Sequence, residues 1–423
     1  MKNWANKKLQ DLCTSVISGG TPLRTVADYY KNGKIPWLKT SEVKKTLIYE
    51  TEEKITEKGL QESSAKLIPE NSIIVAMYGD GNTAGHVAIN KIPLSTNQAC
   101  CNFIIDSNEA YYKFIYYYLK GNYNNLINLK LGGSQQNLNA TNLKKFPIKI
   151  PKPETQKKIA AVLSAYDDLI ENNKRRIAIL ENMAEEIYRE WFVRFRFPGH
   201  EKVKFEKGVP ANWNVIELKN IAYEASKSTK PGEHLSNRFY LPLDLLNTKR
   251  ILPAGHLDYT EAKSSLATFE EGDILFGAMR PYLHKVAIAP FKGITRTTCF
   301  VIRPYDEEDY AYVFLTLFQA FSVDYATMIC NGSDRPYVVW NKAMERMQVL
   351  YPEKAVLKSF EKIVRPILNA IKKKYFILKH LEKTRALLLP RLISGKHSVE
   401  DLDIQFPPSM LDEPPEIREA AYA

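Results

Sequence analysis

The sequence predicts a mixed α/β protein with a pseudo-twofold internal repeat, in which two globular parts are joined by two long helices. Three observations lead to this prediction. A helix-forming segment that begins at Pro151 returns about 200 residues later, at Pro352. Each copy follows a stretch of strands and loops in the same order, which indicates a duplicated architecture. The strands are short, β-branched and mixed with helices, as is typical of an α/β fold.

The composition is that of a folded, basic chain. It has 423 residues, of which 45% are hydrophobic and 25% charged, so about two to three domains are expected. No apolar run approaches the roughly 20 residues of a membrane span. The N-terminus lacks the apolar core of a signal peptide, so we expect a cytoplasmic protein. The net charge of +11 favours polyanions such as nucleic acid, and a basic surface kept for solubility is the alternative.

The two long helices are predicted from matched heptad patterns. In the first segment, the positions expected to pair the helices are Leu163, Ile170, Asn173, Ile177, Leu180 and Ile187. In the second, they are Ile367, Ile371, Lys374, Leu378, Leu381 and Leu388. The polar interruption coincides, because Lys374 lies 201 residues after Asn173, and such a residue can fix register. A lone pattern would suit a core helix or a homodimer, whereas two matched ones predict an intramolecular antiparallel coiled coil, on the order of 50 Å long.

The globular halves correspond in their order of elements. The strand at 73–76 and its turn-rich loop match the strand at 274–277 and its loop. An aromatic helix follows in each half, and in the first we expect Tyr116, Tyr117 and Tyr118 to pack rather than stack on bases. The predicted segments are two globular domains at 1–150 and 199–351, two helices at 151–198 and 352–396, and an acidic tail at 397–423. Because the loops differ while the scaffold repeats, the two domains should read different ligands.

Familiar catalytic motifs are missing from the sequence. It has no G-x-x-x-x-G-K-[ST] phosphate loop, no H-E-x-x-H and no [NDS]-P-P-[YFW] amino-methyltransferase motif. The glycine-rich run Tyr78–Asn82 lacks the strand–turn–helix context of a dinucleotide or S-adenosylmethionine site. Five scattered cysteines without a CxxC pair predict buried, reduced thiols and no metal site. We therefore expect a binding protein without a catalytic site or cofactor of its own, whose partner performs the chemistry.

Five elements, in order and partly in duplicate, resemble the DNA specificity subunit of type I restriction–modification systems, over Leu9 to Lys396. They are Ile17–Pro22 with Gly33–Trp37, Pro210–Trp213 with Glu217-Leu218, Gly272–Phe276 with Met279–Tyr282, the pairs Gly133-Ser134 and Gly332-Ser333 with Gln136 and Arg335, and the long helices with Ile170–Arg175 and Leu389–Gly395. The first two resemble the openings of two target recognition domains.

The resemblance implies a function and a set of partners. Each target recognition domain would read one half of a split double-stranded DNA target, and the antiparallel helices would set the gap. Two modification (methyltransferase) subunits, carrying S-adenosylmethionine, would dock along the helices and methylate adenine at N6. Restriction subunits would use ATP and Mg²⁺ to translocate and cleave unmodified DNA. The acidic tail has no counterpart in the family pattern, and we expect it to be disordered or packed along the helices.

Two other functions stay open at this point. The chain would alternatively be a stand-alone DNA-binding or anti-restriction scaffold that recruits no methyltransferase. A nuclease or methyltransferase with its own active site is disfavoured by the missing motifs.

Ten residues are candidates for DNA contact. Arg280, Arg335, Gln135, Gln136 and Asn137 are candidates for base contact, since Arg can address guanine and Gln or Asn adenine. Phosphate contact or loop capping is the alternative for each of them. Lys39, Lys44, Lys45, Lys227 and Arg296 are candidates for phosphate contact, with a solvated surface as the alternative.

Overall fold

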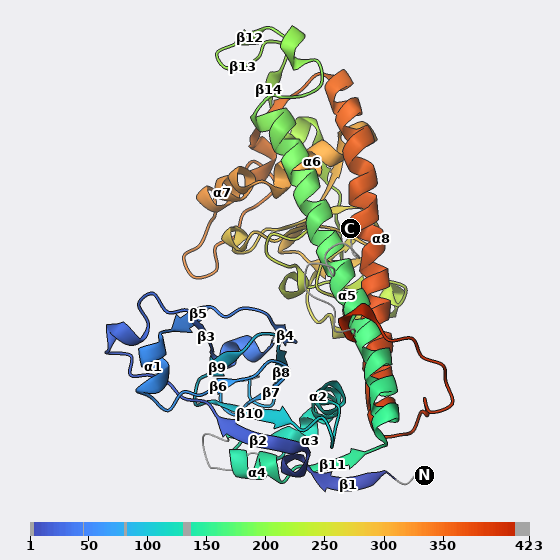
Figure 1. Ribbon diagram of the computed structural model, residues 1–423. Helices are drawn as coiled ribbons and strands as arrows, with labels where there is room; N and C mark the ends of the chain where they lie inside the picture. The colour runs from blue at the N-terminus through green and yellow to red at the C-terminus, as the bar shows by residue number, and fades with distance from the viewer. Residues whose placement is uncertain (1–3, 45, 80–82, 130–136, 411–423) are drawn as a thin grey trace. The chain divides into compact units, whose positions relative to one another are not determined.

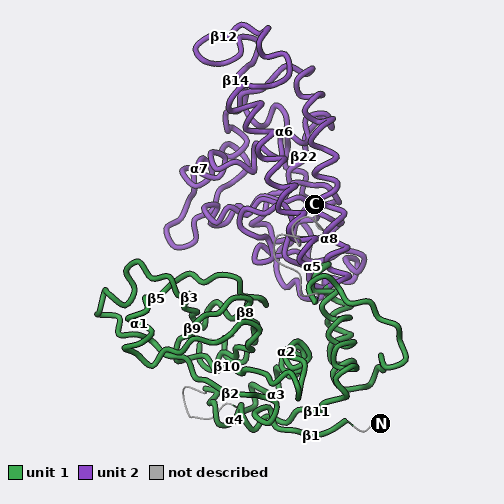
Figure 2. Tube along the Cα trace, viewed as in Figure 1, with its two compact units in different colours: residues 1–169, 382–423 green, residues 170–381 purple. Residues whose placement is uncertain are grey.

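The structure is a computed structural model that describes residues 4–44, 46–79, 83–129 and 137–410 (Figure 1). The chain divides into two compact units (Figure 2), unit 1 with residues 1–169 and 382–423 and unit 2 with residues 170–381. Both divisions fall inside long helices, so the units do not follow the five predicted segments, whose boundaries stay predictions. Among the described helices, none is both long and apolar enough to span a membrane.

Unit 1 is built on two sheets. The five-stranded sheet has the order β2 (Cys13–Ser18), β10 (Cys100–Ile105), β7 (Ile73–Ala76), β8 (Val87–Asn90) and β4 (Leu47–Ile48). The four-stranded sheet has the order β5 (Glu53–Ile55), β3 (Ile35–Leu38), β9 (Leu94–Thr96) and β6 (Leu67–Ile68). β1 (Ala5–Lys8) pairs with β11 (Pro147–Ile150). The short helices are α1 (Glu57–Gln61), α2 (Tyr112–Gly121), α3 (Tyr123–Ile127) and α4 (Ala140–Lys144).

Unit 2 also contains two main sheets. One has the order β15 (Ala222–Glu224), β22 (Cys299–Pro304), β19 (Ile274–Gly277) and β20 (Val286–Ile288). The other has the order β16 (Lys227–Thr229), β18 (Leu266–Phe269), β21 (Gly293–Arg296) and β17 (Phe239–Tyr240). Two further pairs are β14 (Asn214–Glu217) with β23 (Gln348–Tyr351), and β12 (Phe205–Glu206) with β13 (Val209–Pro210). The short helices are α6 (Tyr310–Phe318) and α7 (Ala320–Met328).

The two units share their strand pairings. In unit 1, β7 pairs antiparallel with β8 and β10, and β19 does the same with β20 and β22 in unit 2. β9 pairs parallel with β3 and antiparallel with β6, as β21 does with β17 and β18. The mixed α/β class predicted from the sequence is confirmed, and the described strands repeat in the order that the sequence comparison within the chain suggested.

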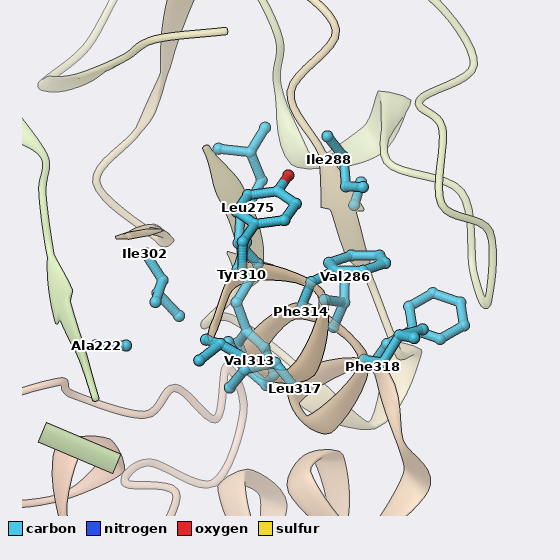
Figure 3. Packing of buried hydrophobic residues seen from close by; sticks show 14 of the residues in the cluster. Ala222, Leu275, Val286, Ile288, Ile302, Tyr310, Val313, Phe314, Leu317 and Phe318 are labelled. Carbon is cyan, nitrogen blue, oxygen red and sulfur yellow. The ribbon is translucent and has the colours of Figure 1, made fainter. Parts of the chain in front are cut away.

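An apolar helix covers the main sheet in each unit. In unit 2, Val313, Phe314 and Leu317 of α6 lie against sheet residues such as Leu275 and Val286 (Figure 3). Burying such side chains contributes roughly 1.5–3 kcal/mol each. In unit 1, Tyr116, Tyr117 and Tyr118 of α2 are buried within a cluster that includes Leu119. The prediction that these tyrosines pack is confirmed, so they are not available to stack on bases.

The long helices are α5 (Pro153–Tyr188) and α8 (Lys354–Ile393) (Figure 1). In unit 2, Lys374 Nζ donates to Asn173 Oδ1 at 3.2 Å. The Phe360 ring lies 5.5 Å from Trp191 and 4.7 Å from Phe192, between ring centroids. Within this unit, residue numbers therefore rise along one helix as they fall along the other, which is an antiparallel arrangement.

The predicted pairing positions are all at least half-buried. Those fully buried are Leu163, Ile170, Ile177 and Ile371, and those half-buried are Asn173, Leu180, Ile187, Ile367, Lys374, Leu378, Leu381 and Leu388. In unit 1, Arg385 Nε lies 2.5 Å from Asp167 Oδ1. The heptad pattern did not predict a second buried face of α8, which includes Leu368 and Tyr375. These two belong to a core cluster with the sheet of unit 2, because a helix beside a globular part is covered on two sides.

The described part of the acidic tail, residues 397–410, lies against unit 1. Val399 is buried, Lys158 Nζ donates to the Glu400 carbonyl at 2.7 Å, and Lys113 Nζ donates to the Ser409 carbonyl at 2.5 Å. Each of these two bonds joins a lysine side chain of unit 1 to the backbone of the tail.

The prediction of buried, reduced thiols holds for three of the five cysteines. All five are free thiols, with Cys100, Cys101 and Cys299 buried and the other two half-buried. Burial raises the pKa of the Cys299 thiol to about 12, so the thiol stays protonated and unreactive at neutral pH. Among the described residues, no group of His, Cys, Asp and Glu could hold a metal ion.

Candidate nucleic-acid interface

Two predicted base-contact residues, Arg280 and Arg335, lie on neighbouring loops of unit 2. The Arg280 amide donates to the Pro336 carbonyl at 2.8 Å, and Met279 forms a β-bridge with Tyr337. Both arginine side chains are exposed. Within the described ranges, neither guanidinium forms an ion pair with a carboxylate. Each guanidinium has five N–H donors, which are therefore available to an anion or to the edge of a base.

The same loop pairing recurs in unit 1. The Val338 amide donates to the Ala278 carbonyl at 3.0 Å, and the Leu138 amide donates to the Met77 carbonyl at 3.1 Å. Each bond joins the loop after the central strand to the segment after a Gly-Ser element. Asn137, a predicted base-contact residue, is half-buried beside this bond. Gln135 and Gln136 lie outside the described residues.

The Arg280 loop is held in a backbone conformation that non-glycine residues rarely adopt. Arg280 and His284 flank the short turn η10 (Pro281–Leu283), and their φ angles are +50° and +51°. His284 is buried, its Nε2 lies 2.8 Å from the Phe318 carbonyl, and its own carbonyl accepts from the Lys249 amide at 3.0 Å. Burial lowers the pKa of His284, so the neutral ring donates Nε2–H to that carbonyl. Strained residues of this kind persist only where surrounding contacts hold them.

The predicted phosphate-contact residues differ in their surroundings. Lys39 is half-buried, and its Nζ lies 2.9 Å from Glu52 and 3.2 Å from Glu53. Hydrogen bonds to these carboxylates raise the pKa of Lys39, and a phosphate would have to compete with them. Lys44, Lys227 and Arg296 are exposed and, within the described ranges, form no ion pair. Lys45 lies outside the described residues.

The opening motif of unit 1 has a packing role. The indole N–H of Trp37 donates to the Gly20 carbonyl at 3.0 Å. A Cβ on Gly20 would lie only 2.3 Å from the backbone of Ser64 and Ala65. The Arg24 guanidinium lies over the rings of Tyr30 and Trp37 at 4.6 and 4.8 Å. These contacts explain the glycine and aromatic positions of the motif by close approach and stacking.

Three exposed side chains near Arg280 were not predicted from the sequence. Tyr282 is 54% exposed, Leu283 is 38% exposed and Tyr337 is 47% exposed. The available signal was an aromatic and an aliphatic residue directly after Arg280-Pro281, within a loop already singled out for its arginine. Such side chains are ordinarily core residues, and only the backbone path turns them to solvent.

The long helices also carry exposed apolar side chains in unit 2. Ile179 and Met183 of α5 are 59% and 47% exposed, and Phe376 and Ile377 of α8 are each 48% exposed. Large exposed apolar side chains on a helix are candidates for protein interaction.

Comparisons with known proteins match this chain to type I specificity subunits. Residues 1–182 match the family model described as the type I restriction modification DNA specificity domain. The chain is 29% identical over 421 residues, 95% of each chain, to the type I restriction enzyme MjaIX specificity subunit of Methanocaldococcus jannaschii. It is 31% identical over 191 residues, 44% of this chain and 46% of the relative, to the EcoR124I/EcoR124II specificity subunit of Escherichia coli.

A solved structure shares the fold. The type I restriction–modification S subunit from M. genitalium superposes with a TM-score of 0.60 at 19% identity, covering 92% of this chain and 96% of that one. This match supports the mixed α/β architecture over nearly the full length.

Proposed function

We propose that this chain is a type I restriction–modification DNA specificity subunit, as its similarity to such subunits supports, and that it reads a DNA target in two separated halves, one with each globular part. The observation that carries this proposal is the recurrent loop pairing of Met77 with Leu138 and of Ala278 with Val338. One scaffold then holds two sets of loops, and the loops differ in sequence. Two different half-sites follow if each set contacts base edges in a groove.

Arg280 and Arg335 are the proposed base-contact residues of the second half, with Asn137, Gln135 and Gln136 in the first. Lys44, Lys45, Lys227 and Arg296 would contact phosphates. Lys39 would do so only by exchanging its bonds to Glu52 and Glu53, which makes it the weakest of these candidates.

The helices α5 and α8 form the proposed coiled-coil spine, and a pseudo-twofold relation of the two halves would follow from it. The Asn173–Lys374 hydrogen bond in unit 2 and the Asp167–Arg385 ion pair in unit 1 support antiparallel pairing. A polar contact inside an apolar interface disfavours other registers, because a shift would leave it unpaired. A helix rises about 1.5 Å per residue, so a spine of this length would set the gap between the half-sites.

Partner subunits would supply the chemistry. The exposed Ile179, Met183, Phe376 and Ile377 offer a surface to which a methyltransferase subunit can dock. Two such subunits, with S-adenosylmethionine, would methylate adenine at N6, and restriction subunits would need ATP and Mg²⁺. This chain would contribute binding and no catalysis, in the cytoplasm.

The experiment that tests the proposal is sequencing of methylated DNA. The chain is co-expressed with the methyltransferase subunit of its own system in a host that lacks N6-methyladenine, and modified positions are mapped across the genome. We expect one bipartite motif, with two short half-sites and a constant gap. A modified but continuous motif would contradict the two-part reading, and an unmodified genome despite a stable complex would contradict the function.

The alternative, a scaffold without a methyltransferase, finds no support in the relatives, which are named as type I specificity subunits. Co-purification separates the two directly. A stable complex with close to two methyltransferase copies per chain supports the proposal, and a chain that binds DNA but recruits no methyltransferase supports the scaffold.

A further inference from the structure

The loop of residues 280–284 exposes two apolar side chains to solvent, and this exposure does not stabilise the fold. Tyr282 and Leu283 are 54% and 38% exposed. Tyr337, which bridges to Met279 on the neighbouring segment, is 47% exposed. Exposed apolar side chains on two bridged segments are candidates for a binding surface.

The loop is rigid, because it is fixed at both ends. At the first, the Arg280 amide donates to the Pro336 carbonyl at 2.8 Å. At the second, His284 is buried and bonded to the Phe318 carbonyl of α6. Pro281 restricts the turn between them, since its ring fixes φ. Binding through Tyr282 and Leu283 would therefore cost little backbone conformational entropy.

The surroundings of the loop select a polyanion as its occupant. Arg280 lies just before the two apolar residues. Arg335 directly precedes Pro336, whose carbonyl accepts a hydrogen bond from the Arg280 amide. Both guanidinium groups are exposed and, in the described part of the chain, lack a carboxylate partner. An apolar tip beside two unpaired cations suits the groove of a DNA duplex, where the cations meet phosphates or base edges and the tip meets the stacked bases.

We propose that Tyr282 and Leu283 form an apolar wedge that enters a groove of the DNA and opens one base step in the half-site read by unit 2. Wedges of this kind partly unstack a step and bend the duplex. Pyrimidine–purine steps open with the least resistance, so the wedge would add specificity at a step that no side chain reads by hydrogen bonds. This inference rests on the proposed function and adds an indirect mode of recognition to it.

The test uses the complex of the full chain with its methyltransferase subunits. Duplexes that carry the mapped target have 2-aminopurine at one position at a time, avoiding the adenine that becomes methylated. Unstacking increases the fluorescence of this base analogue. We expect an increase at one step, only in the half-site assigned to residues 199–351.

Substitutions connect the signal to the loop. Tyr282→Ala should abolish the increase and weaken binding to the target by at least about tenfold, with a smaller loss for Leu283→Ala. Tyr282→Phe should keep both properties, because the ring and not the hydroxyl acts as the wedge. Tyr305→Ala is the matched control, since Tyr305 is 65% exposed in the same unit and stacks on Tyr223 away from this loop. Thermal unfolding of each variant should match that of the parent, because exposed side chains contribute little to stability.

Three outcomes would overturn the wedge. The parent complex would show no increase at any position of that half-site, or Tyr282→Ala would keep both the increase and the affinity. In the third, Tyr282→Ala would bind DNA normally but lose the methyltransferase subunit, which would make the loop a protein-docking surface. In each case the proposed function would stand as long as the parent complex still methylates a bipartite target.

Discussion

Arginines in this chain fall into two groups by their partners. Arg303 is held by two hydrogen bonds to Asp273, and Arg385 is paired with Asp167. Arg280 and Arg335 are exposed and have no such partner within the described ranges. A guanidinium that already meets a carboxylate must give up that bond to reach DNA, whereas an unpaired one need not. This difference separates structural arginines from candidates for recognition.

Replacing Arg335 or Arg280 by Ala should weaken specific DNA binding. If the side chain contacts guanine, the loss is roughly 1–3 kcal/mol and discrimination disappears at one base pair. If it contacts phosphate, affinity falls for every sequence alike, and the salt dependence of binding becomes shallower. Titration of target and mutated-target duplexes at several salt concentrations distinguishes the two. Arg346→Ala, another exposed arginine of unit 2, is the control and should bind like the parent.

Acidification should destabilise unit 2. Burial lowers the pKa of both His256 and His284 from the usual 6.5, and the nearby Lys379 and Lys249 lower it further. Below about pH 6.5, these histidines therefore bind protons in the unfolded chain but not yet in the folded unit. The free energy of unfolding falls as the pH drops from 6.5 towards the lowered pKa values of the folded state. The hydrogen bond to the Phe318 carbonyl, and to a smaller extent Glu185 and Asp324, partly oppose this lowering of the His284 pKa.

Thermal unfolding between pH 7.5 and 5.5 measures this effect. The melting temperature should be lower at pH 5.5, and His284→Gln, which keeps a donor for the Phe318 carbonyl, should reduce the dependence. An unchanged dependence in that variant would assign the effect to other groups.

At the scale of elements, the two long helices show what a heptad pattern does and does not specify. The repeat places Ile177 and Ile371 on buried faces, and it matches Asn173 with Lys374, which are hydrogen-bonded. It does not reveal that Leu368 and Tyr375, one position further along, are also buried. A period of seven describes contact with a single partner helix, whereas these residues pack in a cluster with sheet residues.

Phe360→Ala should be strongly destabilising. Phe360 is fully buried, and its ring lies 4.7–6.4 Å from those of Tyr188, Trp191 and Phe192, between centroids. Removing a buried phenyl ring costs roughly 3–5 kcal/mol through lost burial and the cavity left behind. Chemical denaturation of the full chain, followed by tryptophan fluorescence, measures the loss. Phe376→Ala on the same helix, where the ring is 48% exposed, should change the free energy of unfolding by less than about 1 kcal/mol, and a similar loss in both variants would contradict the argument.

At the scale of the whole molecule, the first globular part should be exchangeable. Replacing residues 1–150 with the corresponding part of a related type I specificity subunit should change one half-site and leave unaltered the half that we propose residues 199–351 read. The donor has to preserve contacts to the retained helix, above all the hydrogen bond of Tyr117 to Asp167 at 2.8 Å. Methylation mapping of the chimera gives the outcome, and a change in both halves would refute independent reading.

The sequence by itself determined the α/β class, the matched order of elements in the two halves and the lack of familiar catalytic motifs, because each of these depends on local periodicity, strand order or a short motif. It also singled out Arg280 and Arg335, since loop arginines after matched elements stand out in a duplicated chain. Only the tertiary structure decided that these two loops are bonded to each other, that Lys39 is engaged by Glu52 and Glu53, and that Tyr282 and Leu283 face solvent. Contacts between segments distant in sequence, and the direction of side chains on an irregular loop, depend on how the whole chain packs, and no local pattern encodes them.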